Sequence, residues 1–118
     1  MAYLLLIIEP RGQRETRSEE QGRAAYAEML AFSAGLKERG LLTTSQALRS
    51  DDHGVRLQKR DGKCLIKDGP FAEAKEMIGG FLLLDCASKE AAVAIAAECP
   101  AAQWATIEVR ELGPCFEA

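Results

Sequence analysis

The segment KDGPFAEAKE, residues 67–76, places a constrained turn among several functional side chains. Gly69 can adopt backbone angles that other residues avoid, and Pro70 fixes φ at a value suited to the first position of a helix. The segment therefore predicts a strand that ends near Asp68, a sharp turn, and a short helical segment after it. Because an aromatic ring, acids and lysines surround this turn, we expect a functional site beside it.

Three further segments predict strands of a sheet. Residues 3–8 and 81–84 are apolar at every position, which indicates strands that are buried on both faces. Residues 104–112 predict the last strand, in which Ile107 and Val109 form an apolar face and polar residues occupy the other face.

A hairpin is predicted from residues 55–59 and 64–67, because the Asp-Gly dipeptide between them is a strong signal for a tight turn. The expected register pairs Lys59 with Cys64, Leu57 with Ile66 and Val55 with Asp68. Directly paired residues share a face, so Asp68 would end an apolar face and its carboxylate would be partly desolvated. Residues 41–47 predict another short extended segment.

Two helices are predicted. Ser18 and Gln21 have the spacing of a capping box, and the helix that follows runs to about residue 39, where Gly40 suits its end. Its apolar stripe contains Tyr26, Met29, Ser33 and Leu36. Ser33 either bonds back to a carbonyl of the preceding turn or lines a polar pocket between helix and sheet. A second helix over residues 89–99 begins after a Ser88 cap and is stopped by Pro100.

This order of elements predicts a single α+β domain over residues 1–118, with a ferredoxin-like antiparallel sheet and two helices on one face. Two helices cover only one face of a sheet, yet residues 3–8 and 81–84 are apolar on both faces. A second copy of the same sheet would cover the other face, so we expect a homodimer.

Composition limits the partners. The chain has 118 residues and a net charge of -3, which argues against a nucleic-acid partner, since phosphate binding needs a clustered basic face. Residues 4–8 form too short an apolar run for an export signal or a membrane span. We expect a cytoplasmic protein with reduced thiols that does not bind membranes.

No metal or other cofactor is expected. The four cysteines, Cys64, Cys86, Cys99 and Cys115, lack the spacing of zinc ligands. The single histidine, His53, directly follows two aspartates in a polar loop, and three adjacent residues do not easily converge on one ion. The chain also has no phosphate-binding glycine loop and no nucleophile motif.

Several of these segments together resemble the YCII-related family, in its DGPF branch. The most specific are residues 68–76 and the GGF sequence at residues 79–81. Residues 1–8, 61–62 and 99–102 extend the resemblance over nearly the whole chain. The resemblance implies a dimeric α/β barrel, in which two ferredoxin-like sheets pack face to face.

The resemblance implies two kinds of function. The broader family has been proposed to be enzymatic because a histidine and an aspartate line a cleft, and the DGPF branch has been linked to transcription initiation through extracytoplasmic-function sigma factors. This chain carries Ser33 where many family members carry the histidine, and Gln46 where a glutamate is often found. A serine cannot carry protons at neutral pH as an imidazole does, which weakens the acid–base version of the hypothesis.

Two hypotheses follow. In the first, the protein binds a small molecule or is a cofactor-independent enzyme with a cleft near Asp68 as catalytic residue; the substrate-binding residues are Ser33, Gln46, Phe71, Glu73 and Lys75. In the second, it is a non-catalytic accessory or interaction protein linked to sigma-factor-dependent transcription regulation. A buried cleft with an acid at its end favours the first, and a shallow cleft with an exposed apolar patch elsewhere favours the second.

Structural roles compete with these assignments. Asp68 can simply cap the turn at Gly69. Glu73 and Lys75 are solvent-exposed charges unless their segment faces the cleft. Trp104 suits the core or a dimer contact better than a ligand platform.

Overall fold

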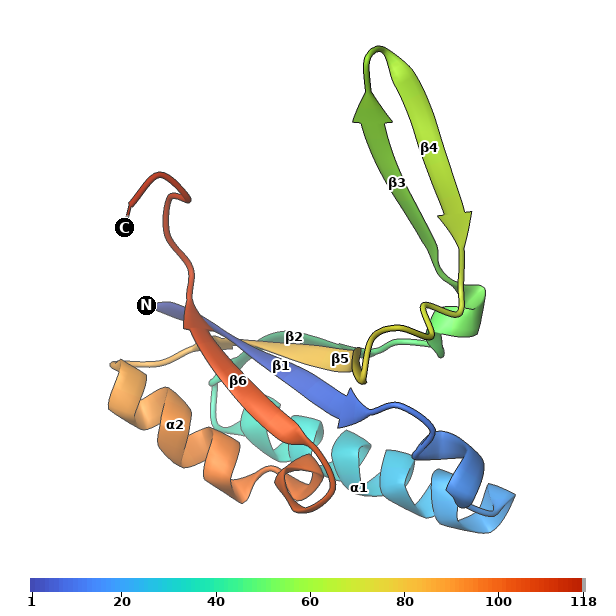
Figure 1. Cartoon of the computed structure of the whole chain (residues 1–118). Coiled ribbons are helices and arrows are strands. Elements are labelled where there is room, and N and C mark those ends of the chain that lie inside the picture. Colours follow the sequence, from blue (N-terminus) through green and yellow to red (C-terminus); the bar gives the residue numbers. More distant parts are fainter. Residues whose placement is uncertain (118) are drawn as a thin grey trace.

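Strand β1, Ala2–Pro10, lies inside a four-stranded antiparallel sheet in the computed structural model, which describes residues 1–117 (Figure 1). The order of strands is β2-β5-β1-β6. The other strands are β2, Leu42–Ala47, β5, Glu76–Asp85, and β6, Thr106–Glu111. Together with two helices on one face, this topology confirms the predicted α+β, ferredoxin-like fold.

Helices α1, Glu19–Glu38, and α2, Lys89–Glu98, lie side by side against one face of the sheet (Figure 1). The predicted capping box of Ser18 and Gln21 is present, and Gly40 follows α1 with φ of +72°. The Ser88 side chain caps α2, as predicted. Within residues 1–117, no helix combines the length and the apolar character needed to cross a bilayer.

Alternation along β1 gives the sheet a covered face and an open face. Every second residue from Tyr3 to Glu9 is buried beneath the helices. The residues between them point away from the helices, on what we call the open face; they pair with apolar residues of β5, as Leu4 with Leu83, Leu6 with Phe81 and Ile8 with Ile78. Both central strands are therefore apolar on both faces, as predicted.

The core lies between the covered face and the helices. Its buried side chains come from the sheet, from both helices and from the short turn η3, Pro100–Gln103: Tyr3, Leu5, Ile7, Leu36, Leu82, Leu84, Cys86, Ala92, Ile95, Ala96, Cys99 and Ala101. In β6, the register places Ile107 and Val109 on the covered face, while Thr106, Glu108 and Arg110 lie on the open face, which confirms the predicted alternation.

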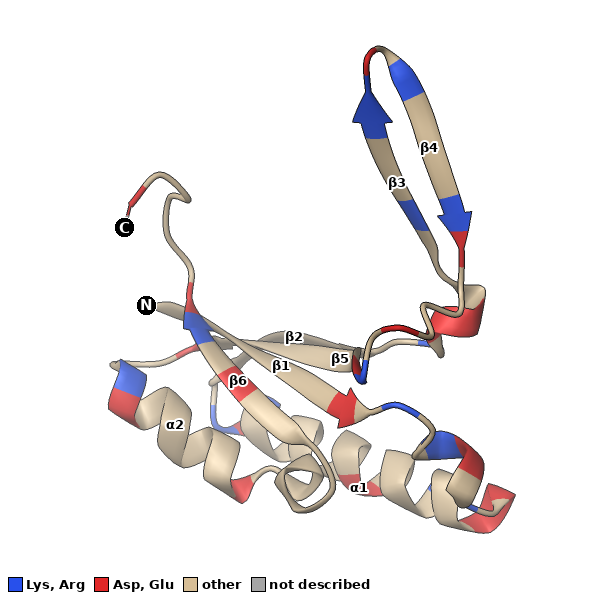
Figure 2. Ribbon diagram, in the orientation of Figure 1, with Lys and Arg blue, Asp and Glu red and all other residues tan. Residues whose placement is uncertain are grey.

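The hairpin of β3, Val55–Arg60, and β4, Lys63–Asp68, stands outside the sheet (Figure 1). Its register is the predicted one, with Val55 opposite Asp68. Every residue of both strands is exposed, so the predicted desolvation of Asp68 is wrong for the chain as described. Basic side chains recur along the hairpin and favour solvent over a core (Figure 2): Arg56, Lys59, Arg60, Lys63 and Lys67.

The segment that follows the hairpin is a turn, and the predicted short helix after Pro70 is wrong. Within residues 69–75 the Phe71 carbonyl accepts from the Ala74 N–H at 2.9 Å, but no helix forms. The carbonyls of Ala74 and Lys75 instead accept hydrogen bonds from Arg11, which lies beyond the end of β1. Long-range bonds thus replace the local ones that would have continued a helix.

Candidate functional site

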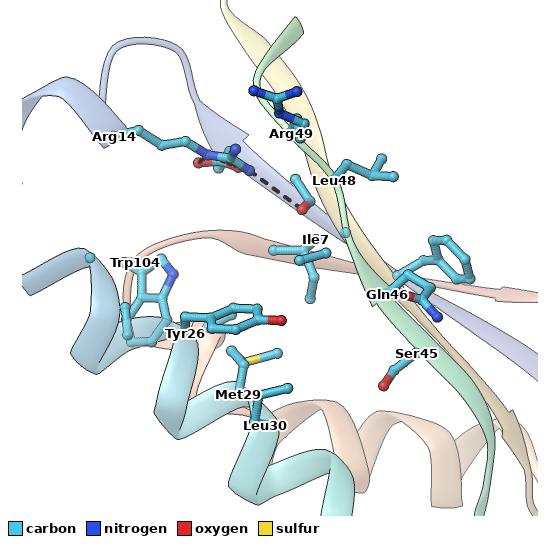
Figure 3. Close-up of a pocket in the computed structure, with 18 of the residues that line it drawn as sticks. Ile7, Arg14, Tyr26, Met29, Leu30, Ser45, Gln46, Leu48, Arg49 and Trp104 are labelled. Atoms are coloured by element: carbon cyan, nitrogen blue, oxygen red, sulfur yellow. Dashed lines mark hydrogen bonds and ion pairs between the residues drawn. The ribbon is translucent and has the colours of Figure 1, made fainter. Parts of the chain in front are cut away.

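A cavity of about 650 Å³ lies between α1 and the covered face of the sheet (Figure 3). We call it the helix cavity. Its volume falls in the range of small-molecule sites, roughly 300–1,000 Å³. Its lining comes from β1, α1, β2 and β5, from the segment between β1 and α1, and from the segments after β2 and after η3. It includes Ile7, Glu9, Arg14, Arg17, Glu19, Gly22, Tyr26, Met29, Leu30, Ser33, Ser45, Gln46, Arg49, Gly79, Phe81 and Trp104.

Glu9 is a buried acid in this lining. It continues the covered-face alternation of β1 and is only 4% exposed. The Arg14 guanidinium donates to Glu9 Oε1 from Nη2 at 2.6 Å and from Nε at 3.0 Å, and it reaches Oε2 at 3.2 Å. A buried carboxylate needs such a partner, because desolvation of an unpaired charge is costly.

Gly79 leaves the space that Glu9 occupies. A Cβ atom at position 79 would lie 1.9 Å from Glu9 Oε1, so a side chain there would displace the carboxylate. Arg14 also approaches the Gly79 carbonyl, with Nη2 at 3.4 Å. The glycine that follows Ile78 thus allows an ion pair to form on the covered face of a sheet.

Polar and apolar groups face each other across the helix cavity. Ser45 of β2 donates from its Oγ to the Ser33 Oγ of α1 at 3.0 Å, so Ser33 lines the pocket between helix and sheet, which was one of the two predicted roles. Tyr26, Met29 and Leu30 line the wall formed by α1 (Figure 3). Tyr26 and Leu30 are more than half exposed, so this part of the apolar stripe borders the cavity and is not sealed in the core.

Trp104, the single tryptophan, also borders the helix cavity. The Arg17 guanidinium lies over its ring at 5.4 Å from the centroid, a cation–π contact. The Trp104 backbone carbonyl accepts a hydrogen bond from Gln13 Nε2 at 2.8 Å. Trp104 packs against the core, as predicted, and at the same time forms part of the candidate site.

A second cavity, of about 640 Å³, lies at the base of the hairpin. We call it the hairpin cavity. It is lined by Ile8, Leu48, Arg49, Ser50, Asp51, His53, Gly54, Arg56, Phe71, Glu76, Met77 and Ile78. The 3-10 turn η2, Asp51–His53, therefore places the single histidine of the sequence in the lining of the same cavity as Phe71.

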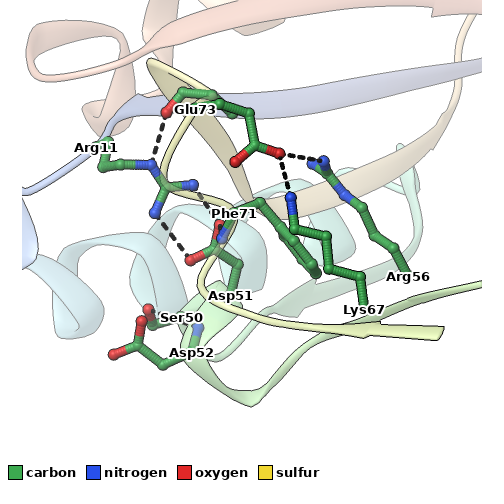
Figure 4. Close-up of polar contacts among 9 residues, drawn as sticks. Arg11, Ser50, Asp51, Asp52, Arg56, Lys67, Phe71 and Glu73 are labelled. Atoms are coloured by element: carbon green, nitrogen blue, oxygen red, sulfur yellow. Dashed lines mark hydrogen bonds and ion pairs between the residues drawn. The ribbon is translucent and has the colours of Figure 1, made fainter.

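The polar contacts around this cavity are ion pairs and caps (Figure 4). Both oxygens of Asp51 accept from Arg11, and one also accepts from the Phe71 N–H at 3.4 Å. Arg11 also donates from Nε to the Ala74 carbonyl at 2.6 Å. The hydrogen bond from Arg11 lowers the pKa of Asp51 and raises the pKa of Arg11 itself.

Glu73 and Phe71 hold the hairpin to the turn that follows it (Figure 4). Glu73 Oε1 lies 2.8 Å from Lys67 Nζ and 3.8 Å from an Arg56 nitrogen. The hydrogen bond from Lys67 lowers the pKa of Glu73. The Arg56 guanidinium lies 3.9 Å from the centroid of the buried Phe71 ring. These contacts give both residues a structural role.

The predicted site residues do not border one cleft. Ser33 and Gln46 line the helix cavity, and Phe71 lines the hairpin cavity. Gln46 is opposite Phe81 in the register, which puts its side chain on the open face. Asp68 is exposed and lines neither cavity, so its assignment as catalytic residue stays a prediction.

Glu73 and Lys75 are exposed and line neither cavity. Within residues 1–117, no three histidine, cysteine, aspartate or glutamate side chains are grouped so that they could hold a metal ion. Asp51, one of the two aspartates that precede His53, is paired with Arg11.

Sequence reasoning missed Glu9 and Arg14. The available signal was the phase of Glu9, which follows Tyr3, Leu5 and Ile7 at every second position of a buried strand. A charged residue in that phase predicts a buried acid that needs a partner, and an arginine five positions later is within reach of it.

The comparisons with known proteins agree with this architecture. Residues 1–115 match the model of the YCII-related domain. The uncharacterized protein R00369 from Rhizobium meliloti (strain 1021) is 31% identical over 114 residues, which cover 95% of this chain and 92% of the relative.

Among solved structures, the chain is similar to 5-chloro-2-hydroxyhydroquinone dehydrochlorinase (TftG) from Burkholderia phenoliruptrix AC1100, in a complex with 2,5-dihydroxybenzoquinone. The TM-score is 0.55 at 20% identity, over 96% of this chain and 94% of that one. At this identity, the similarity concerns the fold.

Proposed function

Because the chain belongs to the YCII-related family, we propose that it binds a small organic molecule in the helix cavity. The observation that carries this proposal is a cavity of about 650 Å³ whose lining contains the buried Glu9, paired with the partly exposed Arg14. The buried acid in this lining is Glu9, whereas the sequence predicted Asp68 as the acid of the cleft. That TftG was solved with a small organic ligand on a similar fold also supports the proposal.

The arrangement supports binding more than proton transfer. Arg14 donates to both oxygens of Glu9, so the carboxylate is engaged within the chain. A general base must instead reach the proton it removes. In this proposal the Glu9–Arg14 pair shapes the site, while the rings of Tyr26 and Trp104 provide contact area for a ligand.

The proposed working form is a homodimer in a reducing compartment. The open face presents Leu4, Leu6, Phe81 and Leu83, which a second sheet would cover. The four cysteines form no disulfide, which supports a cytoplasmic location.

A thermal-shift screen tests the proposal. A library of metabolite-sized organic molecules is added to the full chain, and compounds that raise the melting temperature are tested for a change in Trp104 emission. We expect at least one compound to do both, because ligands of the native state stabilise it by mass action and Trp104 borders the site. A library without any such compound would count against the proposal.

A further inference from the structure

The charges around the helix cavity are unevenly matched. Arg14 is neutralised by Glu9, and Glu19 is bound by Arg23 at 2.7 Å. Arg49, an exposed residue that lines both cavities, makes no hydrogen bond or ion pair with another side chain within residues 1–117. The lining thus contains a guanidinium whose donors are available to a ligand.

Arg17, the third arginine of the lining, is already engaged. Its guanidinium lies over the Trp104 ring and donates to Gln13 Oε1 at 3.4 Å. Three arginines and two glutamates line the cavity, so the lining is net positive although the chain is net negative. This local charge favours an anion.

The backbone holds Arg49 at the cavity. The Leu48 N–H donates to the Gly79 carbonyl at 2.9 Å, which continues the ladder between β2 and β5 up to the residue before Arg49. On its other side, the Ser50 hydroxyl accepts from the Asp52 N–H at 3.3 Å and caps η2. Arg49 is therefore placed by fixed elements on both sides.

Figure 3 shows Arg49 and Arg14 at the same end of the cavity, with Tyr26, Met29 and Leu30 toward the other end. A ligand that satisfies both ends has one anionic group and an apolar body. A planar guanidinium fork matches a carboxylate, which can accept two parallel hydrogen bonds from it.

We propose that the helix cavity takes an organic carboxylate, with the carboxylate bound by Arg49 and the apolar body against Tyr26, Met29 and Leu30. This inference rests on the proposed function and specifies its ligand class. A single guanidinium that is not bound by another side chain suits one negative charge better than a phosphate, which draws on several cations or backbone N–H groups.

The test compares two probes of nearly equal shape, phenylbutyrate and its neutral amide, phenylbutyramide. Each is titrated into the full chain and followed by Trp104 emission and by calorimetry. We expect the carboxylate to bind about 10-fold or more tightly than the amide, the ratio typical of a hydrogen bond to a charged group. Arg49→Gln should remove this preference, so that both probes bind the variant with similar affinity.

Arg39→Gln is the matched control. Arg39 lies outside the cavity and pairs with Glu98 on the surface, so both probes should bind this variant as they bind the wild type. Equal affinities of carboxylate and amide for the wild type would overturn the carboxylate inference while leaving small-molecule binding intact. The carboxylate inference would also be overturned if Arg49→Gln kept the full preference for the carboxylate, or if neither probe bound. Small-molecule binding as such is tested separately, by the thermal-shift screen.

Discussion

Asp51 is the residue that connects the parts of this chain. Its carboxylate accepts from Arg11, which follows β1, and from the backbone of Phe71, which follows the hairpin. Its own carbonyl lies where a side chain at position 69 would be, since a Cβ on Gly69 would come within 1.7 Å of that oxygen. The glycine of the 67–76 segment is therefore required by close packing on Asp51.

The Arg11–Asp51 pair predicts how stability depends on pH. Arg11 lowers the pKa of Asp51 in the folded protein, so the pair stabilises the fold fully above the ordinary aspartate pKa of about 3.9. This stabilisation is lost as the pH falls through the lower, folded pKa. Asp51→Asn should therefore lower the free energy of unfolding at about pH 7, and its difference from wild type should shrink at about pH 2.

Urea denaturation of both proteins at the two pH values measures this difference. Glu73→Gln is the control, because the Glu73 pair is solvent-exposed and exposed pairs contribute little. We expect a smaller loss of stability for this variant at neutral pH. A difference for Asp51→Asn that stays constant with pH would contradict the account.

Asp68 provides a second prediction at the residue scale. It is exposed and lines neither cavity, so Asp68→Asn should leave ligand binding in the helix cavity unchanged. The substitution should lower the free energy of unfolding by less than the roughly 0.5–2 kcal/mol that is lost when a capping side chain is removed. A thermal melt and a ligand titration of this variant check both statements. Lost binding with a retained fold would make Asp68 the functional acid.

At the scale of elements, helix α1 can be tested through its glycines. A Cβ at Gly22 or at Gly35 would meet no atom within 4 Å, but only Gly22 borders the helix cavity. Replacing a glycine inside a helix gains roughly 0.5–1 kcal/mol. We therefore expect Gly22→Leu and Gly35→Leu each to raise the free energy of unfolding, measured with urea. A destabilised Gly22→Leu would mean that the cavity wall has no room there.

Local signals predicted the elements well. The capping box at Ser18 and the turn at Asp61-Gly62 depend on nearest neighbours, and both are present as predicted. The segment after Pro70 was mispredicted as helical because its carbonyls bond to Arg11, more than sixty positions away in the chain. The position of the hairpin also depends on long-range pairing. Strand β2 occupies the edge of the sheet beside β5, and β3 and β4 pair only with each other.

The candidate site was predicted only in part. Ser33 interrupts an apolar stripe, which left two roles open, and it takes the second of them by lining the helix cavity. Glu9 was missed because its role depends on Gly79, which is far away in sequence and leaves space for its carboxylate. The phase of Glu9 in β1 indicated a buried acid, but neither segment carries a local signal for the contact between Glu9 and Gly79.

At the scale of the whole molecule, the open face predicts a homodimer. Light scattering at micromolar concentration should give twice the chain mass of 12.8 kDa. Leu4→Lys places a charge on the open face opposite Arg110, where a partner sheet would bury two like charges at high cost, so this variant should be monomeric. Val93→Lys, at an exposed apolar position of α2, is the control and should remain dimeric. A monomeric wild type would contradict the barrel arrangement.

The helix cavity is the proposed ligand site, and calorimetry on the two α1 variants is the sharpest check of this assignment. The most stabilising compound from the screen is titrated into wild type, Gly22→Leu and Gly35→Leu. The new side chain at position 22 extends from the cavity wall, whereas position 35 lies outside the cavity. We predict binding at least about 10-fold weaker in Gly22→Leu, equivalent to about 1.4 kcal/mol, and unchanged in Gly35→Leu. Equal affinity in all three proteins would place the ligand elsewhere and contradict the claim.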